Sequence, residues 1–259
     1  MARPLVCCAL VPALAACGFQ HGEAADDAPA ALDARPLDAR PLDARPVDAR
    51  PSDAAPPPFT FEQVASAEDM SQAGETIAFG KPQLAGDLDV VMIGWFKAGT
   101  LASVSDSAGN SYAIAAGPTT IASGMETQVI YYACGIRAGA NTVTVTFQDA
   151  SQDPDVRIAE YGGVASSACL DTSVSATGTT TAIDSGALAT AAGHELLIGG
   201  DKVYYLTAMG DASYTTRTIT GYGDLVEDRV ADTAGSYHAL ATENQTGAWV
   251  MQLAAFAGP

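Results

Sequence analysis

Residues 141–148 read NTVTVTFQ, in which threonine alternates with valine and phenylalanine. Successive side chains of an extended strand point to opposite faces, so Val143, Val145 and Phe147 share one face and the threonines the other. This pattern predicts a β-strand that is buried on one side and solvated on the other. Nothing after residue 58 has the pattern of a long amphipathic helix, and the folded part is therefore predicted to be all-β.

Two further runs, DVVMIGWF at 89–96 and TQVIYYAC at 127–134, are apolar at successive positions. Such runs are typical of central strands that are covered on both faces. Further strands are predicted at 103–106, 111–115, 156–161, 194–200, 214–219, 225–231, 236–242 and 247–256. So many short strands between turn residues indicate an antiparallel two-sheet β-sandwich, jelly-roll-like, over residues 59–259.

Two details of this sandwich are also expected. A tight turn at 106–110 (DSAGN), in which Gly109 and Asn110 can take positive φ, is predicted to join the strands 103–106 and 111–115. The last strand belongs to the core, because three large apolar side chains alternate onto one inner face: Trp249, Met251 and Leu253.

The charge of the chain restricts its partners. The sequence has 30 acidic and 12 basic residues, and its net charge of −18 is spread along the chain. Nucleic acid and anionic membrane surfaces would be repelled by such a field, so nucleic acid is not an expected partner. The length of 259 residues leaves room for one large sandwich domain.

The N-terminus has the features of an export signal. Arg3 precedes an apolar run at 5–13 that is too short to cross a bilayer, and the run is followed by LAAC at 14–17. This sequence resembles the lipobox of bacterial lipoproteins, which implies that residues 1–16 are removed and that Cys17 is acylated, palmitate included. Gly18 in place of aspartate favours the outer membrane, with the domain on its periplasmic or outer side. The alternative is ordinary signal cleavage and a soluble secreted protein.

Residues 17–58 are predicted to be a disordered linker between the anchor and the domain. Residues 32–56 repeat a pentapeptide: LDARP three times, then VDARP and SDAAP. Proline at every fifth position breaks helices and sheet ladders, and alternating Asp and Arg keep the segment solvated. We therefore interpret it as an extended spacer; the alternative is that the repeat is itself a ligand.

The cysteines sort by position. Cys7 and Cys8 lie in the leader, and acylation would occupy Cys17, so Cys134 and Cys169 remain as a pair. Outside the cytoplasm this pair is expected to form a disulfide. The alternative is two buried free thiols.

Five phrases resemble a β-sandwich module that recurs in secreted and surface proteins of environmental bacteria. They are VSDSAGNSY (104–112), VIYYACGIRAGANTVTVTF (129–147), RIAEYGGV (157–164), EDRVADTAGSYHA (227–239) and GAWVMQLAAF (247–256). The resemblance covers roughly residues 60–259. It implies the fold and an extracellular setting, and it transfers no catalytic residue.

The sequence does not favour an enzyme. It has no Gly-x-Ser-x-Gly elbow, and the folded part contains only His194 and His238, without zinc-protease spacing. Jelly-roll scaffolds often carry glycosidases and polysaccharide lyases, so a carbohydrate-active enzyme that uses Glu227 or Asp228 as acid or base is the alternative. On a strand these two neighbours point to opposite faces, which separates the acids.

Two binding sites are predicted. Three aspartates of one loop offer oxygen ligands for calcium, although in so acidic a chain they are also expected as solvated residues: Asp149, Asp153 and Asp155. Four tyrosines near strand ends offer ring faces that can stack on sugars, or else close the edges of the core: Tyr204, Tyr205, Tyr214 and Tyr222. The favoured function is a non-enzymatic binding or adhesion module for polysaccharide or matrix at the cell surface. The third alternative is a structural envelope protein.

Overall fold

A computed structural model describes residues 57–68, 71–96 and 99–259. The predictions for the signal peptide, for Cys17 and for the linker up to residue 56 lie outside these residues. Every regular element that the structure describes is a β-strand, and all strand pairs are antiparallel, which confirms the all-β sandwich. No helix that could span a membrane is found in the described part of the chain.

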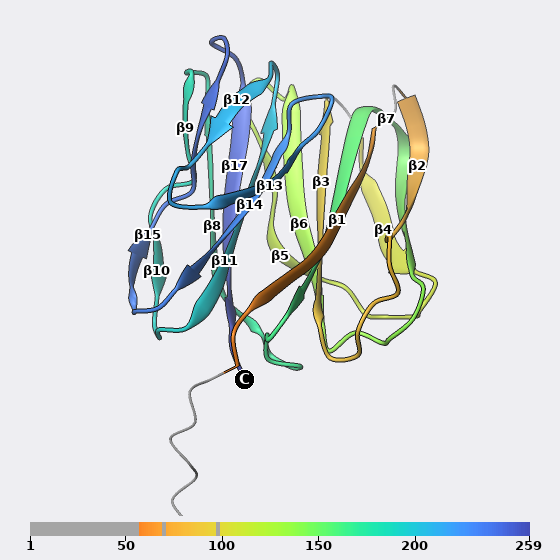
Figure 1. Ribbon diagram of the computed structural model, residues 1–259. Helices are drawn as coiled ribbons and strands as arrows, with labels where there is room; N and C mark the ends of the chain where they lie inside the picture. The colour runs from red at the N-terminus through yellow and green to blue at the C-terminus, as the bar shows by residue number, and fades with distance from the viewer. Residues whose placement is uncertain (1–56, 69–70, 97–98) are drawn as a thin grey trace, which may run out of the picture. The chain divides into compact units, whose positions relative to one another are not determined.

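Two central sheets form the middle of the domain (Figure 1). The first has the strand order β1 (Thr60–Glu68), β7 (Thr142–Gly162), β3 (Leu88–Phe96), β6 (Glu126–Cys134) and β5 (Ala113–Thr120). The second has the order β13 (Thr215–Ile219), β14 (Leu225–Ala231), β11 (Glu195–Val203), β17 (Trp249–Ala257) and β8 (Leu170–Gly178).

Shorter strands cover the outer faces of both central sheets. On the first, β2 (Ser71–Ala78) and β4 (Leu101–Asp106) pair with the beginning of β7. On the second, β12 (Thr207–Gly210), β16 (Leu240–Glu243) and β9 (Ala182–Asp184) form one small sheet, and β10 (Leu188–Thr190) and β15 (Gly235–Tyr237) form another. The sandwich is thus thickened on both sides.

Three apolar clusters separate these layers. The central core lies between the two central sheets and includes Leu88 and Met92 of β3, Ile130 of β6 and Ile198 of β11. The first outer core lies on the other face of the first sheet, and the second outer core on the other face of the second. Adjacent residues of β3 enter different cores, and this confirms that residues 89–96 are covered on both faces.

Other predicted strand details are confirmed as well. Val143, Val145 and Phe147 are buried in the first outer core, while the threonines between them are less buried. The C-terminal strand contributes one alternating set to the second outer core: Trp249, Met251, Leu253 and Ala255. Periodicity thus identified the buried face of 141–148. In the C-terminal strand both faces are buried, and the set predicted for an inner face packs in the second outer core, not between the two central sheets.

Strand β7 differs from the prediction. The sequence predicts separate strands at 141–148 and 156–161, but the structure has one strand of 21 residues. Its first part pairs with β2 and β4, and its last part pairs with β1 and β3, so the strand belongs to two layers. The polar residues between the two apolar runs stay in the strand because β2 extends alongside them, with Ser71 opposite Gln152.

The predicted hairpin at 106–110 is wrong. The turn exists, since Gly109 has a φ of 74° and the Asp106 carboxylate accepts the Asn110 backbone N–H at 2.9 Å. The strands on its two sides do not pair with each other, because β4 pairs with β7 and β5 pairs with β6. The turn therefore connects two layers.

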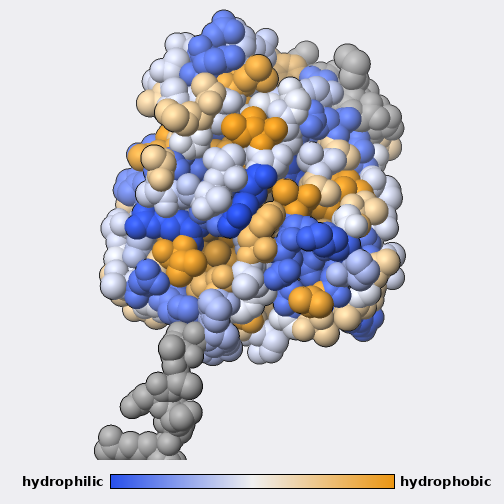
Figure 2. All heavy atoms as spheres, in the orientation of Figure 1, coloured by the Kyte–Doolittle hydropathy of each residue, from blue (hydrophilic) through white to orange (hydrophobic). Residues whose placement is uncertain are grey.

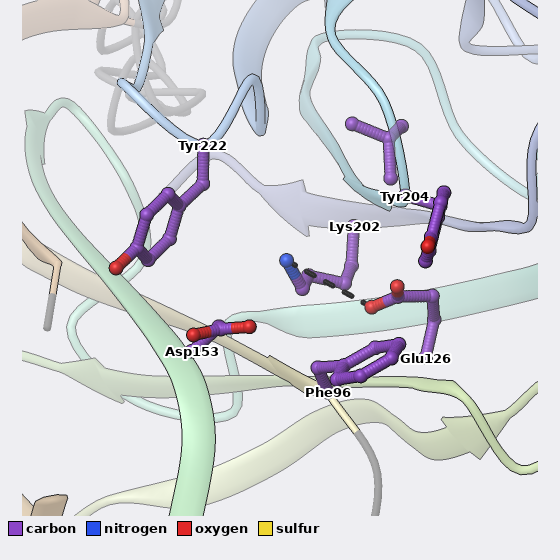
Figure 3. Close-up of a pocket in the computed structure, with 7 residues that line it drawn as sticks. Phe96, Glu126, Asp153, Lys202, Tyr204 and Tyr222 are labelled. Atoms are coloured by element: carbon purple, nitrogen blue, oxygen red, sulfur yellow. Dashed lines mark ion pairs between the residues drawn. The ribbon is translucent and has the colours of Figure 1, made fainter. Parts of the chain in front are cut away.

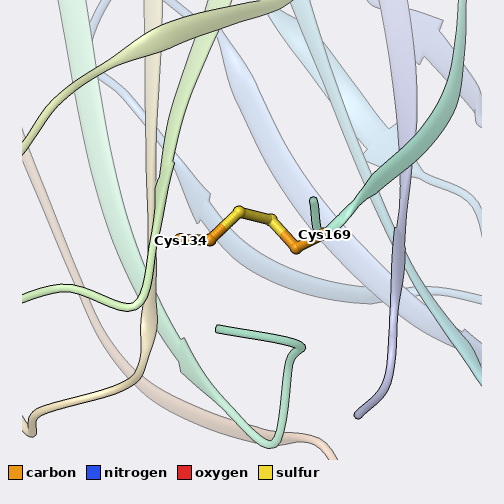
Figure 4. Close-up of a disulfide and its surroundings, with 2 residues drawn as sticks. All are labelled: Cys134 and Cys169. Carbon is orange, nitrogen blue, oxygen red and sulfur yellow. A yellow bond between two sulfur atoms is a disulfide. The ribbon is translucent and has the colours of Figure 1, made fainter. Parts of the chain in front are cut away.

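The predicted disulfide between Cys134 and Cys169 is present, with 6.3 Å between the Cα atoms (Figure 4). Cys134 ends β6 of the first central sheet, and Cys169 immediately precedes β8 of the second. The bond therefore links the two central sheets directly.

The exposed apolar side chains do not gather into a broad patch on the face that Figure 2 shows. There, hydrophobic residues occur as small areas between hydrophilic ones. The exposed large hydrophobic residues of the described chain are Leu84, Ile114, Tyr204, Leu206, Met209, Ile219, Val230 and Leu240. This face lacks the contiguous apolar area that marks many protein interfaces.

Candidate functional site

The space between the two central sheets changes character along its length. In one part it is filled by the central core, and beyond Met92 it is filled by charged and amide side chains. These side chains come from four strands and are all buried: Glu126 and Gln128 of β6, Asp155 and Arg157 of β7, Lys202 of β11 and Gln252 of β17. Buried charges are stable only when they are paired and hydrogen-bonded, so their contacts define the site.

Arg157 holds the centre of this polar region. Its Nη1 donates to the backbone carbonyls of Asp201 at 2.7 Å and Leu225 at 2.8 Å, and its Nη2 donates to Gln128 Oε1 at 2.8 Å. Its Nε lies 3.1 Å from Asp155 Oδ1, and both side chains are fully buried. One guanidinium group on β7 thus binds residues of β6, β11 and the start of β14.

Lys202 crosses from the second sheet toward the first because Gly94 leaves room for it. A Cβ on Gly94 would lie 2.5 Å from Cδ of Lys202, so a larger residue there would displace the lysine. The Lys202 ammonium lies 3.3 Å from Asp224 Oδ2 and 3.8 Å from Glu126 Oε2. Asp224 is therefore the nearer of the two acidic partners of Lys202.

Glu126 is left incompletely satisfied. The residue is 1% exposed, and its Oε2 has no hydrogen-bond partner. Burial raises the pKa of Glu126 to about 8; Lys202 opposes this rise, and Asp224 adds to it. The Glu126 carboxyl group is therefore largely protonated at neutral pH.

A pocket of about 440 Å³ opens at this end of the polar region. It is lined by Phe96, Glu126, Asp153, Lys202, Val203, Tyr204 and Tyr222. In Figure 3, Tyr222 and Asp153 lie on one side of Lys202, and Tyr204, Phe96 and Glu126 lie on the other. The volume is within the range of small-molecule sites, and the lining combines aromatic faces with a few charged groups.

The aromatic side chains of the pocket contact one another and the lysine. The Phe96 and Tyr204 ring centroids are 5.9 Å apart, and Tyr205 packs edge-on against Tyr204 at 5.0 Å. The Lys202 ammonium lies 5.9 Å from the centre of the Tyr222 ring. Tyr204 is 50% exposed, so its ring is accessible to a ligand.

The structure brings together most of the predicted tyrosine group. Tyr204 and Tyr222 line the pocket, and Tyr205 supports Tyr204. Tyr214 does not belong with them: it is 8% exposed and packs in the second outer core, since its ring fills that apolar layer. Burial, together with nearby Glu227, raises the pKa of Tyr214.

The predicted calcium ligands are not arranged around one point. Asp149 is exposed, Asp153 lines the pocket, and Asp155 faces Arg157. Within the described ranges, no group of three His, Cys, Asp or Glu side chains is placed to hold a metal ion. Calcium binding by these aspartates stays a prediction from the sequence.

The carboxylates of the alternative enzyme hypothesis lie away from the pocket lining. Glu227 accepts the Asp211 backbone N–H at 3.0 Å, and burial raises its pKa to about 8. Asp228 points to the other face of β14 and accepts a hydrogen bond from Arg217 Nη2 at 2.9 Å. The predicted separation of these two acids by the strand is thus observed, and both have structural partners.

The two histidines are also apart from the pocket. His194 stacks on Phe59 with 4.6 Å between ring centroids, and His238 Nδ1 lies 2.8 Å from Asp184 Oδ1. Neither contact includes a serine nucleophile. No protein family, no curated protein and no solved structure matches this chain, so the site is interpreted from its own geometry.

Proposed function

We propose that this chain is an outer-membrane lipoprotein whose β-sandwich binds polysaccharide, without catalysing a reaction, through the pocket at the polar end of the central sheets. The observation that carries the proposal is the lining of the pocket. Phe96, Tyr204 and Tyr222 surround a buried carboxyl group and an ammonium group.

This combination suits a sugar ring. The apolar face of a pyranose stacks on aromatic side chains, and its hydroxyl groups need polar partners of fixed position. Lys202 supplies a donor, and the largely protonated Glu126 carboxyl group supplies both a donor and an acceptor; the Lys202 ammonium is held by Asp224.

The location rests on the sequence. The lipobox resemblance at 14–17 supports a lipid anchor, and the linker that follows would hold the domain away from the membrane. The disulfide supports an oxidising compartment, where such bonds persist.

A carbohydrate-active enzyme is the second candidate, and one observation favours it. Glu126 lines the pocket with a pKa of about 8, which is suitable for a general acid. Glu227 and Asp228 do not line the pocket, so an enzyme would have to use Glu126 in their place. A reducing-sugar assay on every polysaccharide that binds separates binding from hydrolysis.

The proposal is tested with the purified full chain on a glycan array, followed by calorimetry on the glycans that bind. Replacing Tyr204 by alanine removes an accessible ring, and we expect affinity to fall about tenfold. Tyr237→Ala is the matched control, because Tyr237 does not line the pocket. The proposal is wrong if no glycan binds, or if Tyr204→Ala and Tyr237→Ala bind as tightly as the unmodified protein.

A further inference from the structure

We propose that the pocket selects sugars that carry a free amino group, so that its ligand class is a cationic, hexosamine-containing polysaccharide. This inference rests on the proposed sugar-binding function and adds the chemistry of the ligand. It follows from three features: the charge balance around the pocket, one buried carboxyl oxygen, and the aromatic rings.

The charge balance at Glu126 is negative. Lys202 is the positive group that acts on it, whereas Asp224, Asp153 and Glu243 all disfavour its ionisation. The ammonium of Lys202 is closer to Asp224, at 3.3 Å, than to Glu126, at 3.8 Å. A second positive charge in the pocket would therefore meet carboxylates that Lys202 does not neutralise.

The second feature is a buried acceptor oxygen without a hydrogen-bond donor, since Lys202 Nζ, at 3.8 Å from Glu126 Oε2, is too far to donate to it. Glu126 is almost fully buried, it lines the pocket, and its Oε2 lacks a hydrogen-bond partner. Leaving a buried carboxyl oxygen without a donor is costly, and a ligand that donates an N–H to it removes that cost. A charged donor gives the stronger bond, because the carboxyl group ionises in response.

The third feature is the ring set. Tyr222 already contacts one ammonium, that of Lys202, at 5.9 Å from its ring centre. Aromatic faces attract cations, and they attract most strongly where water is excluded. Phe96 and Tyr204 border the side of the pocket on which Glu126 lies (Figure 3). Ring and carboxyl group thus favour the same kind of substituent.

Binding of an ammonium group has a measurable proton balance. At pH 5.5 the Glu126 carboxyl group, with a pKa of about 8, is protonated. The amino group of glucosamine is a weaker base than that of lysine, because neighbouring oxygens withdraw electrons from it, and at this pH it also carries its proton. When the ammonium approaches, Glu126 ionises and its proton goes to the buffer. The bond that breaks is the carboxyl O–H, and the product is an ammonium–carboxylate pair.

The test compares two oligosaccharides of the same length, β-1,4-linked glucosamine and its N-acetylated form, by calorimetry at pH 5.5 in two buffers of different ionisation enthalpy. We expect the unmodified full chain to bind the amino form about tenfold more tightly, with release of about one proton. Glu126→Gln should bind both forms about equally and release no proton. Glu227→Gln is the matched control, because it replaces another buried acid of raised pKa that lies outside the pocket lining.

A second variant and a third ligand make the result decisive. Asp153→Asn, on the less buried side of the pocket, should reduce the preference without removing it, even if Glu126→Gln does not fold. Cyclohexylammonium carries the charge on a six-membered ring without hydroxyl groups. If it binds and both sugars do not, the sugar-binding function is wrong and the cation site stands.

Three outcomes overturn the inference. If the acetylated and amino forms bind the unmodified protein equally, the pocket is a sugar site without charge selection. If Glu126→Gln and Asp153→Asn both keep the full preference and the proton release, the ammonium group binds elsewhere. If none of the three ligands binds, the inference and the sugar-binding function fail together.

Discussion

Arg157→Met is expected to be among the most destabilising single substitutions in this domain. Methionine keeps the apolar stem of the buried side chain and removes every polar contact of the guanidinium group. The change leaves the carbonyls of Asp201 and Leu225 and the Gln128 amide oxygen without their donor. It also leaves Asp155 buried without its cation.

The size of the effect follows from these losses. Removing one partner of a buried ion pair costs about 3 to 5 kcal/mol. The lost hydrogen bonds add to this, whereas protonation of Asp155 limits it, because burial already raises the pKa of that residue well above its ordinary value. We therefore expect a loss of about 4 kcal/mol, a large part of the roughly 5 to 15 kcal/mol that typically stabilises a domain.

Urea unfolding followed by tryptophan fluorescence measures this loss. Arg137→Met is the control: the Arg137 side chain is exposed and donates one hydrogen bond, to the Ala108 carbonyl at 2.7 Å, so its loss should cost less than about 1 kcal/mol. A double variant, Arg157→Met with Asp155→Asn, should recover part of the stability, because it removes the unpaired charge. If Arg157→Met unfolds at the same urea concentration as Arg137→Met, the role assigned to this network is wrong.

Three other predictions concern the disulfide, the buried carboxyl group of Glu227 and the lipid anchor at Cys17. Replacing Cys134 and Cys169 by serine opens a 35-residue loop and should lower the free energy of unfolding by about 4 kcal/mol, and a reductant should have the same effect on the unmodified protein. Because the folded-state pKa of Glu227 is raised to about 8 from 4.5, its contribution to stability is present below about pH 4 and is lost as pH rises to 8. The melting temperature should therefore fall over that range, and Glu227→Gln should flatten the fall; an unchanged slope would contradict the assignment. Cys17→Ser should abolish labelled palmitate incorporation and membrane retention, and a variant that still fractionates with membranes would refute the lipid anchor.

Much of the fold is predictable from the sequence because period-two alternation depends only on which face is buried. Residues 141–148 and 89–96 each have the burial that their patterns predict. The disulfide follows from elimination, since only two cysteines lie in the sandwich. By contrast, β1 and β8 have weak alternation, and the sequence prediction omits them. They become strands because β7 and β17 offer long edges for pairing.

The candidate site is less predictable because its residues come together only in three dimensions. Two tyrosines of the pocket are expected from their place near strand ends, but Phe96, Glu126 and Lys202 are not. Glu126 precedes the apolar run of β6 and Lys202 follows that of β11, so each looks like a solvated strand end. One signal is present in the sequence: Gly94 is a glycine inside an otherwise apolar strand, which indicates a close approach by another group. Only the structure shows that this group is the Lys202 side chain.

The polar region is better explained by binding than by stability. Between the same two sheets, the central core shows that apolar side chains can fill the gap completely. Buried ion pairs are often no more stabilising than apolar residues of equal volume, so folding alone does not require Arg157, Lys202 and Glu126 at this end. Departures from the simple rules of core packing are expected where a protein carries its function. Here the departure lies next to the pocket, and Glu126, whose buried oxygen lacks a donor, lines it. We infer that this end of the domain is less stable without ligand, and that a ligand completes the hydrogen bonding of Glu126. A ligand that fits should therefore raise the melting temperature of the unmodified protein more than that of Glu126→Gln.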